Sequence, residues 1–167
     1  GYGMVESLVA KHCKVVISSR KQDDINRTIE RLVSKGAQQN HLTGCACDVT
    51  KLDDVQKLWQ HAIDTFGRID VWVNNAGTTN AQVNFEKTPP HELKAVVDTN
   101  MLGVVNGSYV AINGMLQQGF GAVYNMEGFG SDGSRQPGMA LYGATKYGLR
   151  YLTLSMAEEH KQSPIIV

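Results

Sequence analysis

The sequence lacks any apolar run close to the roughly 20 residues that a membrane-spanning helix needs, and no secretory signal opens it. It also lacks an excess of charge, because 16 Lys and Arg balance 16 Asp and Glu, so no overall field favours nucleic acid or an anionic membrane. The three cysteines, Cys13, Cys45 and Cys47, include no Cys-x-x-Cys pair. We therefore expect Cys45 and Cys47 to be small buried side chains on one strand face in a reducing compartment, the alternative being a metal or redox site.

Internal repeats and low-complexity segments are missing as well. The length of 167 residues predicts a single domain over 1–167, large enough to bury a core without a metal or a disulfide. An apolar fraction of 42% and a charged fraction of 19% are ordinary for a globular protein, so composition points to no special class.

Helix-like and strand-like segments alternate along the chain, which predicts an α/β fold with a parallel sheet. Strands are expected over 14–18, 42–48, 69–73, 121–125 and from 165. Helices are expected over 4–11, 23–35, 53–66, 91–118 and 140–159. Asp23 or Asp24 can cap the second of these helices, and the glycines that crowd 128–138 predict a mobile loop.

Both ends of the chain interrupt this pattern. The sequence begins with a glycine and a predicted helix, and it ends inside a predicted strand. A doubly wound sheet has its first strand near its centre, where the strand order reverses. We therefore expect the natural protein to continue in both directions, with that first strand and a C-terminal substrate segment outside these residues.

The pair Tyr142 and Lys146 is the strongest chemical signal. The two residues are four positions apart, so on a helix they share one face. An ammonium close to a phenol stabilises the phenolate, and a tyrosine in that setting can exchange a proton with a carbonyl or an alcohol. The alternative is an ordinary Tyr and Lys on an amphipathic helix.

Polar residues also follow two predicted strands. The turn 74–77, Asn-Asn-Ala-Gly, comes directly after one strand and lets the backbone approach a ligand at the sheet edge. Asp48 and Val49 end another strand, where a carboxylate can accept a hydrogen bond from an adenine amino group. Asn100 lies in mid-helix and predicts a local distortion that frees a backbone carbonyl for a water. Taken singly, these are a plain turn, a capping or solvated Asp, and a surface Asn.

In this order and at these spacings, the motifs resemble the classical short-chain dehydrogenase/reductase family over nearly the whole chain. The resemblance implies a Rossmann-type doubly wound parallel sheet in a three-layer α/β/α arrangement. It also implies an oxidoreductase that passes a hydride between a nicotinamide and a carbonyl or alcohol carbon.

The resemblance implies a role for each matching residue. Tyr142 would be the acid or base, Lys146 would stabilise its phenolate and hold the nicotinamide ribose, and Asn100 would position a water of the proton relay. Gly1 looks like the last glycine of the family's phosphate loop, the rest of which is absent. The cofactor-binding residues would be Gly1, Ser18, Ser19, Arg20, Asp48, Val49, Asn75, Ala76, Gly77, Tyr142 and Lys146.

The end of the strand over 14–18 bears on the choice of cofactor. NAD-specific Rossmann proteins place an acidic residue there, on the ribose 2′-hydroxyl. Here Ser19 stands at that position and Arg20 follows, and a guanidinium can pair with a 2′-phosphate at two points. The sequence therefore predicts NADP(H) over NAD(H), the alternative being a solvated Arg before a helix.

The family's serine, about thirteen residues before the tyrosine, is missing. Phe129, or Gly128 if one loop residue is extra, stands in its place, with Ser131 the nearest hydroxyl and Glu127 the nearest carboxyl. This loop resembles that of the chlorophyll b reductases, a branch that reduces a formyl group on a chlorin with NADPH. We expect Ser131, or a backbone N–H near Gly128, to polarise the carbonyl. The alternative is that Ser131 merely caps or solvates the loop.

Three functions are carried forward. The first is an NADPH-dependent carbonyl reductase, of the formyl-chlorin type; the second is an alcohol or sugar dehydrogenase of the same family. The third is a catalytically silent dinucleotide-binding protein, which only the lost serine supports. The resemblance further implies a homo-oligomer, a dimer or tetramer, acting on a small-molecule carbonyl. A cytoplasmic location is expected, or a plastid for a chain from a photosynthetic eukaryote.

Overall fold

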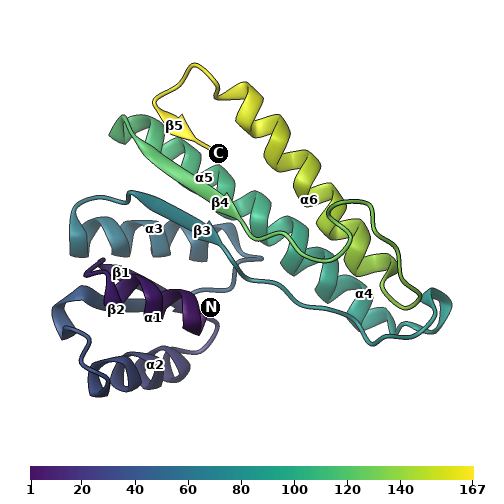
Figure 1. Cartoon of the computed structure of the whole chain (residues 1–167), viewed down its shortest axis with the longest axis horizontal. Helices are drawn as coiled ribbons and strands as arrows, with labels where there is room; N and C mark the ends of the chain where they lie inside the picture. The colour runs from purple at the N-terminus through teal and green to yellow at the C-terminus, as the bar shows by residue number, and fades with distance from the viewer. The chain divides into compact units, whose positions relative to one another are not determined.

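The computed structural model describes residues 1–167, in which helices alternate with parallel strands (Figure 1). The chain divides into two compact units, Gly1–Ile69 and Asp70–Val167. The first contains the parallel pair β1-β2, and the second a parallel sheet with the strand order β3-β4-β5. The α/β class with parallel pairing is thus confirmed, whereas the expectation of a single domain stays a prediction.

Three helices and two strands build the first unit. They are α1 (Tyr2–Ala10), β1 (Val15–Ser19), α2 (Gln22–Ser34), β2 (Leu42–Ala46) and α3 (Leu52–Phe66), with a short 3-10 helix η1 (Gln39–His41) before β2. Val9, Leu32 and Leu42 form a buried cluster between α1, α2 and the strands. Gly44 lets α2 approach β2, because a Cβ at this position would lie 2.3 Å from Ile25 Cγ2.

Three predictions for this unit were wrong in detail. Neither Asp23 nor Asp24 caps α2; Lys21 is the N-cap, and the two carboxylates lie in the first helical turn, where the helix dipole also favours negative charge. Cys47 is buried as expected, but Cys45 is only partly buried. β2 ends at Ala46 rather than at Asp48, although the Cys47 N–H still donates to the Ser19 carbonyl at 2.9 Å.

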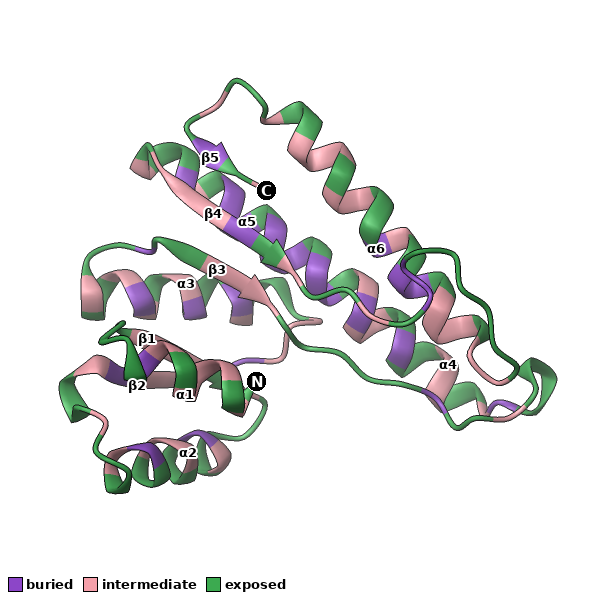
Figure 2. Ribbon diagram, viewed as in Figure 1, coloured by how far each residue is buried: buried purple, intermediate pink, exposed green.

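The second unit holds the other strands and the longest helices. Its elements are β3 (Val71–Asn74), the 3-10 helix η2 (Phe85–Lys87), α4 (Pro90–Val97), the π-helix η3 (Asp98–Leu102), α5 (Gly103–Gln118), β4 (Gly121–Asn125), α6 (Ala140–Glu159) and β5 (Ile165–Ile166). Asn74 pairs with Asn125 where β3 and β4 end together. Buried residues concentrate on α5 and on the middle of β4 (Figure 2), where Val104, Ala111, Met115 and Val123 form much of the core.

The long helix predicted over 91–118 is present but interrupted. α4, η3 and α5 follow one another without a break, and the π-helical turn between them has Asn100 at its centre. A π-turn inside an α-helix inserts one residue and loosens the backbone hydrogen bonds around it. The distortion predicted at Asn100 is therefore confirmed. None of the helices combines the length and the apolar character that a membrane span requires.

Candidate active site

Tyr142 and Lys146 lie one turn apart on α6, with the Lys146 Nζ 5.8 Å from the centroid of the Tyr142 ring. Lys146 is only 5% exposed, and its Nζ donates a hydrogen bond of 2.8 Å to the carbonyl of Met126, just beyond β4. Burial lowers the pKa of the Lys146 ammonium, while the carboxylate of Glu127 raises it. The helix therefore holds an amine and a phenol side by side at a strand end.

Two glycines show how closely other segments approach this pair. A Cβ on Gly77 would lie 3.8 Å from the Lys146 Nζ and 3.5 Å from the Asn100 Oδ1. A Cβ on Gly128 would lie 2.4 Å from the Tyr142 hydroxyl, so the phenol takes the space that a side chain at 128 would need. The Asn-Asn-Ala-Gly turn, η3, α6 and the loop after β4 thus meet where β3 and β4 end.

Asn100 is fully buried, and its amide joins η3 to the segment after the turn. The Oδ1 accepts a hydrogen bond of 2.8 Å from the Thr78 N–H, and the Nδ2 donates to the Thr78 carbonyl at 2.9 Å. The Nδ2 also donates to the Thr145 hydroxyl at 3.1 Å, and that hydroxyl donates to the Tyr142 carbonyl at 2.7 Å. Sequence patterns did not indicate these roles of Thr78 and Thr145, and the role of Asn100 toward a water stays a prediction.

Asn74 is a second polar residue whose role was missed. Its Oδ1 accepts from the Trp72 indole N–H at 2.9 Å, and its Nδ2 donates to the Asn125 Oδ1 at 2.8 Å and to the Ser108 hydroxyl at 3.1 Å. The Asn125 amide in turn donates to the Thr153 hydroxyl on α6 at 2.9 Å. This chain of hydrogen bonds fixes β3, β4, α5 and α6 beneath the site.

The backbone of the glycine-rich loop over 128–138 packs closely against neighbouring segments at several points. A Cβ on Gly130 would come within 2.7 Å of the Gly143 Cα on α6, and one on Gly138 within 3.0 Å of the Gln82 backbone. Buried Asn80 donates to the Gly138 carbonyl at 3.2 Å. Ser131 is 7% exposed and its N–H donates to the Gly128 carbonyl at 3.1 Å. The loop is thus anchored, whereas its predicted mobility and the role of Ser131 stay predictions.

Several of the predicted cofactor residues lie in the first unit and are described within it. Ser18 and Ser19 end β1, and exposed Arg20 follows them. The Asp48 Oδ1 accepts hydrogen bonds from the Thr50 hydroxyl at 2.8 Å and from the Thr50 N–H at 3.1 Å, and these bonds, with Arg20 as a minor contributor, lower the pKa of Asp48.

Gly1 is the N-cap of α1, the helix that would face a bound pyrophosphate. Val49 follows Asp48 in the same turn, and Asn75, Ala76 and Gly77 are exposed after β3. The cofactor roles of all these residues stay predictions.

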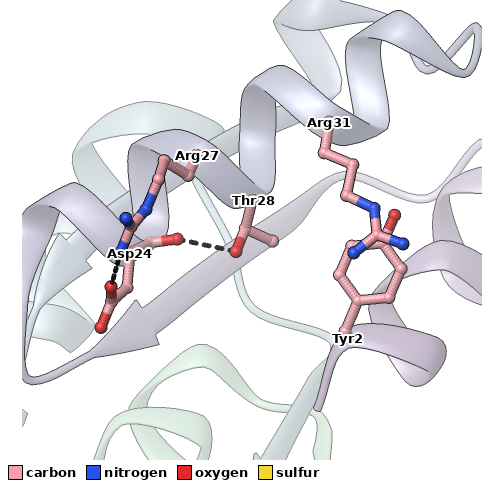
Figure 3. Close-up of a pocket in the computed structure, with 5 residues that line it drawn as sticks. All are labelled: Tyr2, Asp24, Arg27, Thr28 and Arg31. Atoms are coloured by element: carbon pink, nitrogen blue, oxygen red, sulfur yellow. Dashed lines mark hydrogen bonds and ion pairs between the residues drawn. The ribbon is translucent and has the colours of Figure 1, made fainter.

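One cavity of about 270 Å³ lies between α1 and α2, and none of the predicted catalytic or cofactor-binding residues lines it (Figure 3). Its two guanidinium groups are already engaged: Arg31 stacks on the Tyr2 ring at 4.6 Å, and Arg27 forms an ion pair with Asp24. The Arg31–Tyr2 contact joins α2 to α1, and the Arg27–Asp24 pair lies within α2, so both arginines are explained by local structure rather than by the candidate site.

The fold and the site together define an α/β protein with a tyrosine–lysine pair at the carboxyl ends of parallel strands. A family model described as "short chain dehydrogenase" matches residues 1–167, and the chain belongs to that family. This confirms the resemblance seen in the motifs.

Curated relatives include plant proteins. The chain is 35% identical to the probable chlorophyll(ide) b reductase NYC1, chloroplastic, of Oryza sativa subsp. japonica, over 99% of this chain and 36% of that protein. It is 34% identical to the chlorophyll(ide) b reductase NOL, chloroplastic, of Arabidopsis thaliana, over 95% of this chain and 46% of that protein. The chain therefore spans between about a third and a half of the length of these relatives.

Solved structures confirm the Rossmann-type fold. ElxO with NADP bound superposes with a TM-score of 0.88 at 28% identity, covering 99% of this chain and 66% of that one. A short chain dehydrogenase from Mycobacterium smegmatis has a TM-score of 0.89 at 23% identity, covering 99% of this chain and 68% of that one. At this identity the likeness supports the fold alone.

Proposed function

We propose that this chain is the catalytic part of an NADP(H)-dependent oxidoreductase that reduces a carbonyl, with Tyr142 as the proton donor. The buried Lys146 ammonium beside the Tyr142 phenol, at the carboxyl ends of β3 and β4, carries the proposal. Bound cofactor supplies the hydride. Tyr142 gives its proton to the developing alkoxide, and Lys146, fixed by the Met126 carbonyl, stabilises the phenolate that remains.

Replacement of the phenol tests this role directly. Tyr142→Phe should lower NADPH oxidation in the presence of an aldehyde by about 100-fold or more, the range expected for loss of a general acid. Tyr147→Phe is the matched control, because Tyr147 lies on the same helix and is 59% exposed. Equal turnover by the two variants would eliminate Tyr142 as the proton donor.

The preference for NADP(H) rests on the first unit. Ser19 leaves no carboxylate to repel a 2′-phosphate, and exposed Arg20 can pair with it. Two structural relatives are described as ElxO with NADP or NADPH bound, which supports the same cofactor here. The double change Ser19→Asp with Arg20→Leu should reverse the preference in favour of NADH. Unchanged NADPH selectivity would refute the assignment.

We further propose a formyl group on a chlorin as the substrate carbonyl. The likeness to the NYC1 and NOL proteins and the glycine at 128 support this class, since Gly128 leaves no side chain above the phenol. Ser131, or a backbone N–H near Gly128, would polarise the carbonyl oxygen. Ser131→Ala should slow formyl-chlorin reduction, whereas Ser134→Ala, an exposed change in the same loop, should not. Unaltered turnover in Ser131→Ala would exclude the hydroxyl.

A dehydrogenase acting on an alcohol is the second candidate. The chain is 30% identical to a 2,3-dihydroxy-2,3-dihydro-p-cumate dehydrogenase of Pseudomonas putida over its whole length. NADP+ reduction with diols, compared with NADPH oxidation with aldehydes and a formyl chlorin, separates the two functions. Measurable turnover with diols alone would favour this candidate.

Exposed apolar side chains on two helices support a homo-oligomer. Tyr147, Tyr151 and Leu154 recur along α6 at helical spacing, and Leu102, Val105 and Tyr109 do so along η3 and α5. Tyr151→Asp should therefore shift the mass measured by light scattering toward a monomer.

The chloroplastic relatives favour a plastid location over a cytoplasmic one, which imaging of the tagged natural protein would test.

A further inference from the structure

Glu127 lies directly beside the carbonyl that holds the catalytic lysine. Met126 accepts the Lys146 hydrogen bond at 2.8 Å, and Glu127 is the next residue of the loop. The Glu127 Oε2 accepts a charged hydrogen bond from the Arg150 Nη1 at 3.4 Å. Arg150 follows Lys146 by four positions and Tyr142 by eight, so a phenol, an ammonium and a guanidinium form a row along one face of α6.

Lys146 is nearly buried and has no ion pair of its own. Its hydrogen-bond acceptor is a neutral carbonyl, and the side chain that η3 places near it is the neutral amide of Asn100. Tyr142 and Arg150 lie one turn before and one turn after it on its own helix, and Glu127 is the charged residue of the loop that acts on it. Glu127 is the one that can offset the cost of burying a positive charge.

We propose that Glu127 is a positioning residue for the Tyr142–Lys146 pair: its carboxylate, held by Arg150, supplies the counter-charge that keeps the buried lysine an ammonium. This inference rests on the proposed function and names a further residue of the same site. A purely structural explanation is weak, because the Glu127 and Arg150 side chains are 44% and 46% exposed, and ion pairs at such positions add little to stability.

The proposal predicts changes of opposite sign. Burial lowers the pKa of Lys146 and Glu127 raises it, so Glu127→Gln should lower that pKa. Arg150→Gln removes a positive charge from the same helix face and frees the carboxylate, so it should raise the pKa. The double variant removes both charges of the pair, so its Lys146 pKa should lie between those of the two single variants. Glu127→Asp keeps the negative charge, so its Lys146 pKa should be closer to that of the parent than the Lys146 pKa of Glu127→Gln.

The titration of Lys146 can be followed in the whole chain by NMR of 13Cε-labelled lysine, with the Lys146 signal assigned by its loss in Lys146→Met. Glu158→Gln is the control, since Glu158 also lies on α6 and pairs with a different lysine, Lys161. The proposal is overturned if the Lys146 pKa in Glu127→Gln is no lower than in the parent, or falls equally in Glu158→Gln. Should Glu127→Gln fail to fold, absence of a rise in Arg150→Gln has the same consequence.

This measurement needs neither cofactor nor substrate, so it fails separately from the proposed function. If the Lys146 pKa falls in Glu127→Gln and rises in Arg150→Gln but the chain oxidises no NADPH, the proposed function is contradicted and the role of Glu127 stands. A chain that oxidises NADPH while Lys146 titrates identically in all variants would contradict only the role of Glu127.

Discussion

Gly107 on α5 faces the polar network beneath the site, and its replacement by alanine is the sharpest stability test. A Cβ at this position would lie 2.0 Å from the Asn74 Oδ1 and 3.2 Å from the Trp72 Nε1. Real contacts of this kind are more than an ångström longer, so the Asn74 amide would have to move. It could not do so and keep its hydrogen bonds to Trp72, Ser108 and Asn125.

The cost follows from those three hydrogen bonds. Each contributes about 1 kcal/mol net, which makes the loss about 3 kcal/mol before any penalty for groups left unpaired. Alanine is preferred to glycine in a helix by about 1 kcal/mol, which offsets part of this loss. Gly107→Ala should therefore lower the free energy of unfolding of the second unit by about 2 kcal/mol, within the range seen for overpacked cores.

This loss in the free energy of unfolding can be measured by urea unfolding followed by Trp72 fluorescence, in a Trp59→Phe background that leaves one tryptophan. Gly148→Ala is the matched control, because its Cβ would meet only the flexible end of Met101, at 3.4 Å. It should be neutral or stabilising. In an Asn74→Ala background the amide that would clash with the new Cβ is absent, so Gly107→Ala should lower the free energy of unfolding far less there. If Gly107→Ala is as stable as Gly148→Ala in the parent, the packing argument is wrong.

Four further outcomes can be checked. Asn100→Ala removes the three hydrogen bonds of a buried amide and should lower the free energy of unfolding in urea by about 3 kcal/mol; a loss below about 1 kcal/mol would contradict the bridging role. Gly130 and Gly133 have the same left-handed backbone conformation, so alanine is equally strained at both positions. Only the Cβ at 130 would also collide with backbone atoms, those of Gly143, so Gly130→Ala should have the lower thermal midpoint. Burial, aided by nearby carboxylates, raises the pKa of Cys47 from 9.0 to about 11. Stability should thus fall as pH rises through this interval, because the unfolded thiol ionises first, and the fall should be smaller in Cys47→Ala. Iodoacetamide should also label exposed Cys13 before Cys47.

Local patterns were enough to predict most elements of the fold. The helix predicted over 140–159 coincides with α6, and the strand over 121–125 coincides with β4. Asn100, a poor helix former in mid-helix, predicted a local distortion, and the structure shows that distortion to be a π-turn. For these elements, periodicity and local sequence chemistry were enough.

Contacts between distant residues were beyond such patterns. Asn74 was taken only as part of a turn, yet its partners Ser108 and Asn125 lie 34 and 51 positions away. No local spacing indicates which amide will meet which hydroxyl across a sheet. The cap of α2 was wrong for a related reason, since Asp23 and Asp24 both suit the first turn and the sequence cannot rank the two uses.

The absent family serine gains a physical meaning from the packing around Gly128. A side chain there would overlap the Tyr142 hydroxyl in its present position, so the phenol and a serine at 128 cannot both be placed as they stand. Insertion of a hydroxyl at 128 would therefore displace Tyr142 from Lys146 rather than simply add a second donor. The glycine and the tyrosine form one arrangement, and under the proposed function the carbonyl-polarising group would be another group of the same loop. Ser131, nearly buried and tied to the Gly128 carbonyl through its own N–H, is placed within that same turn.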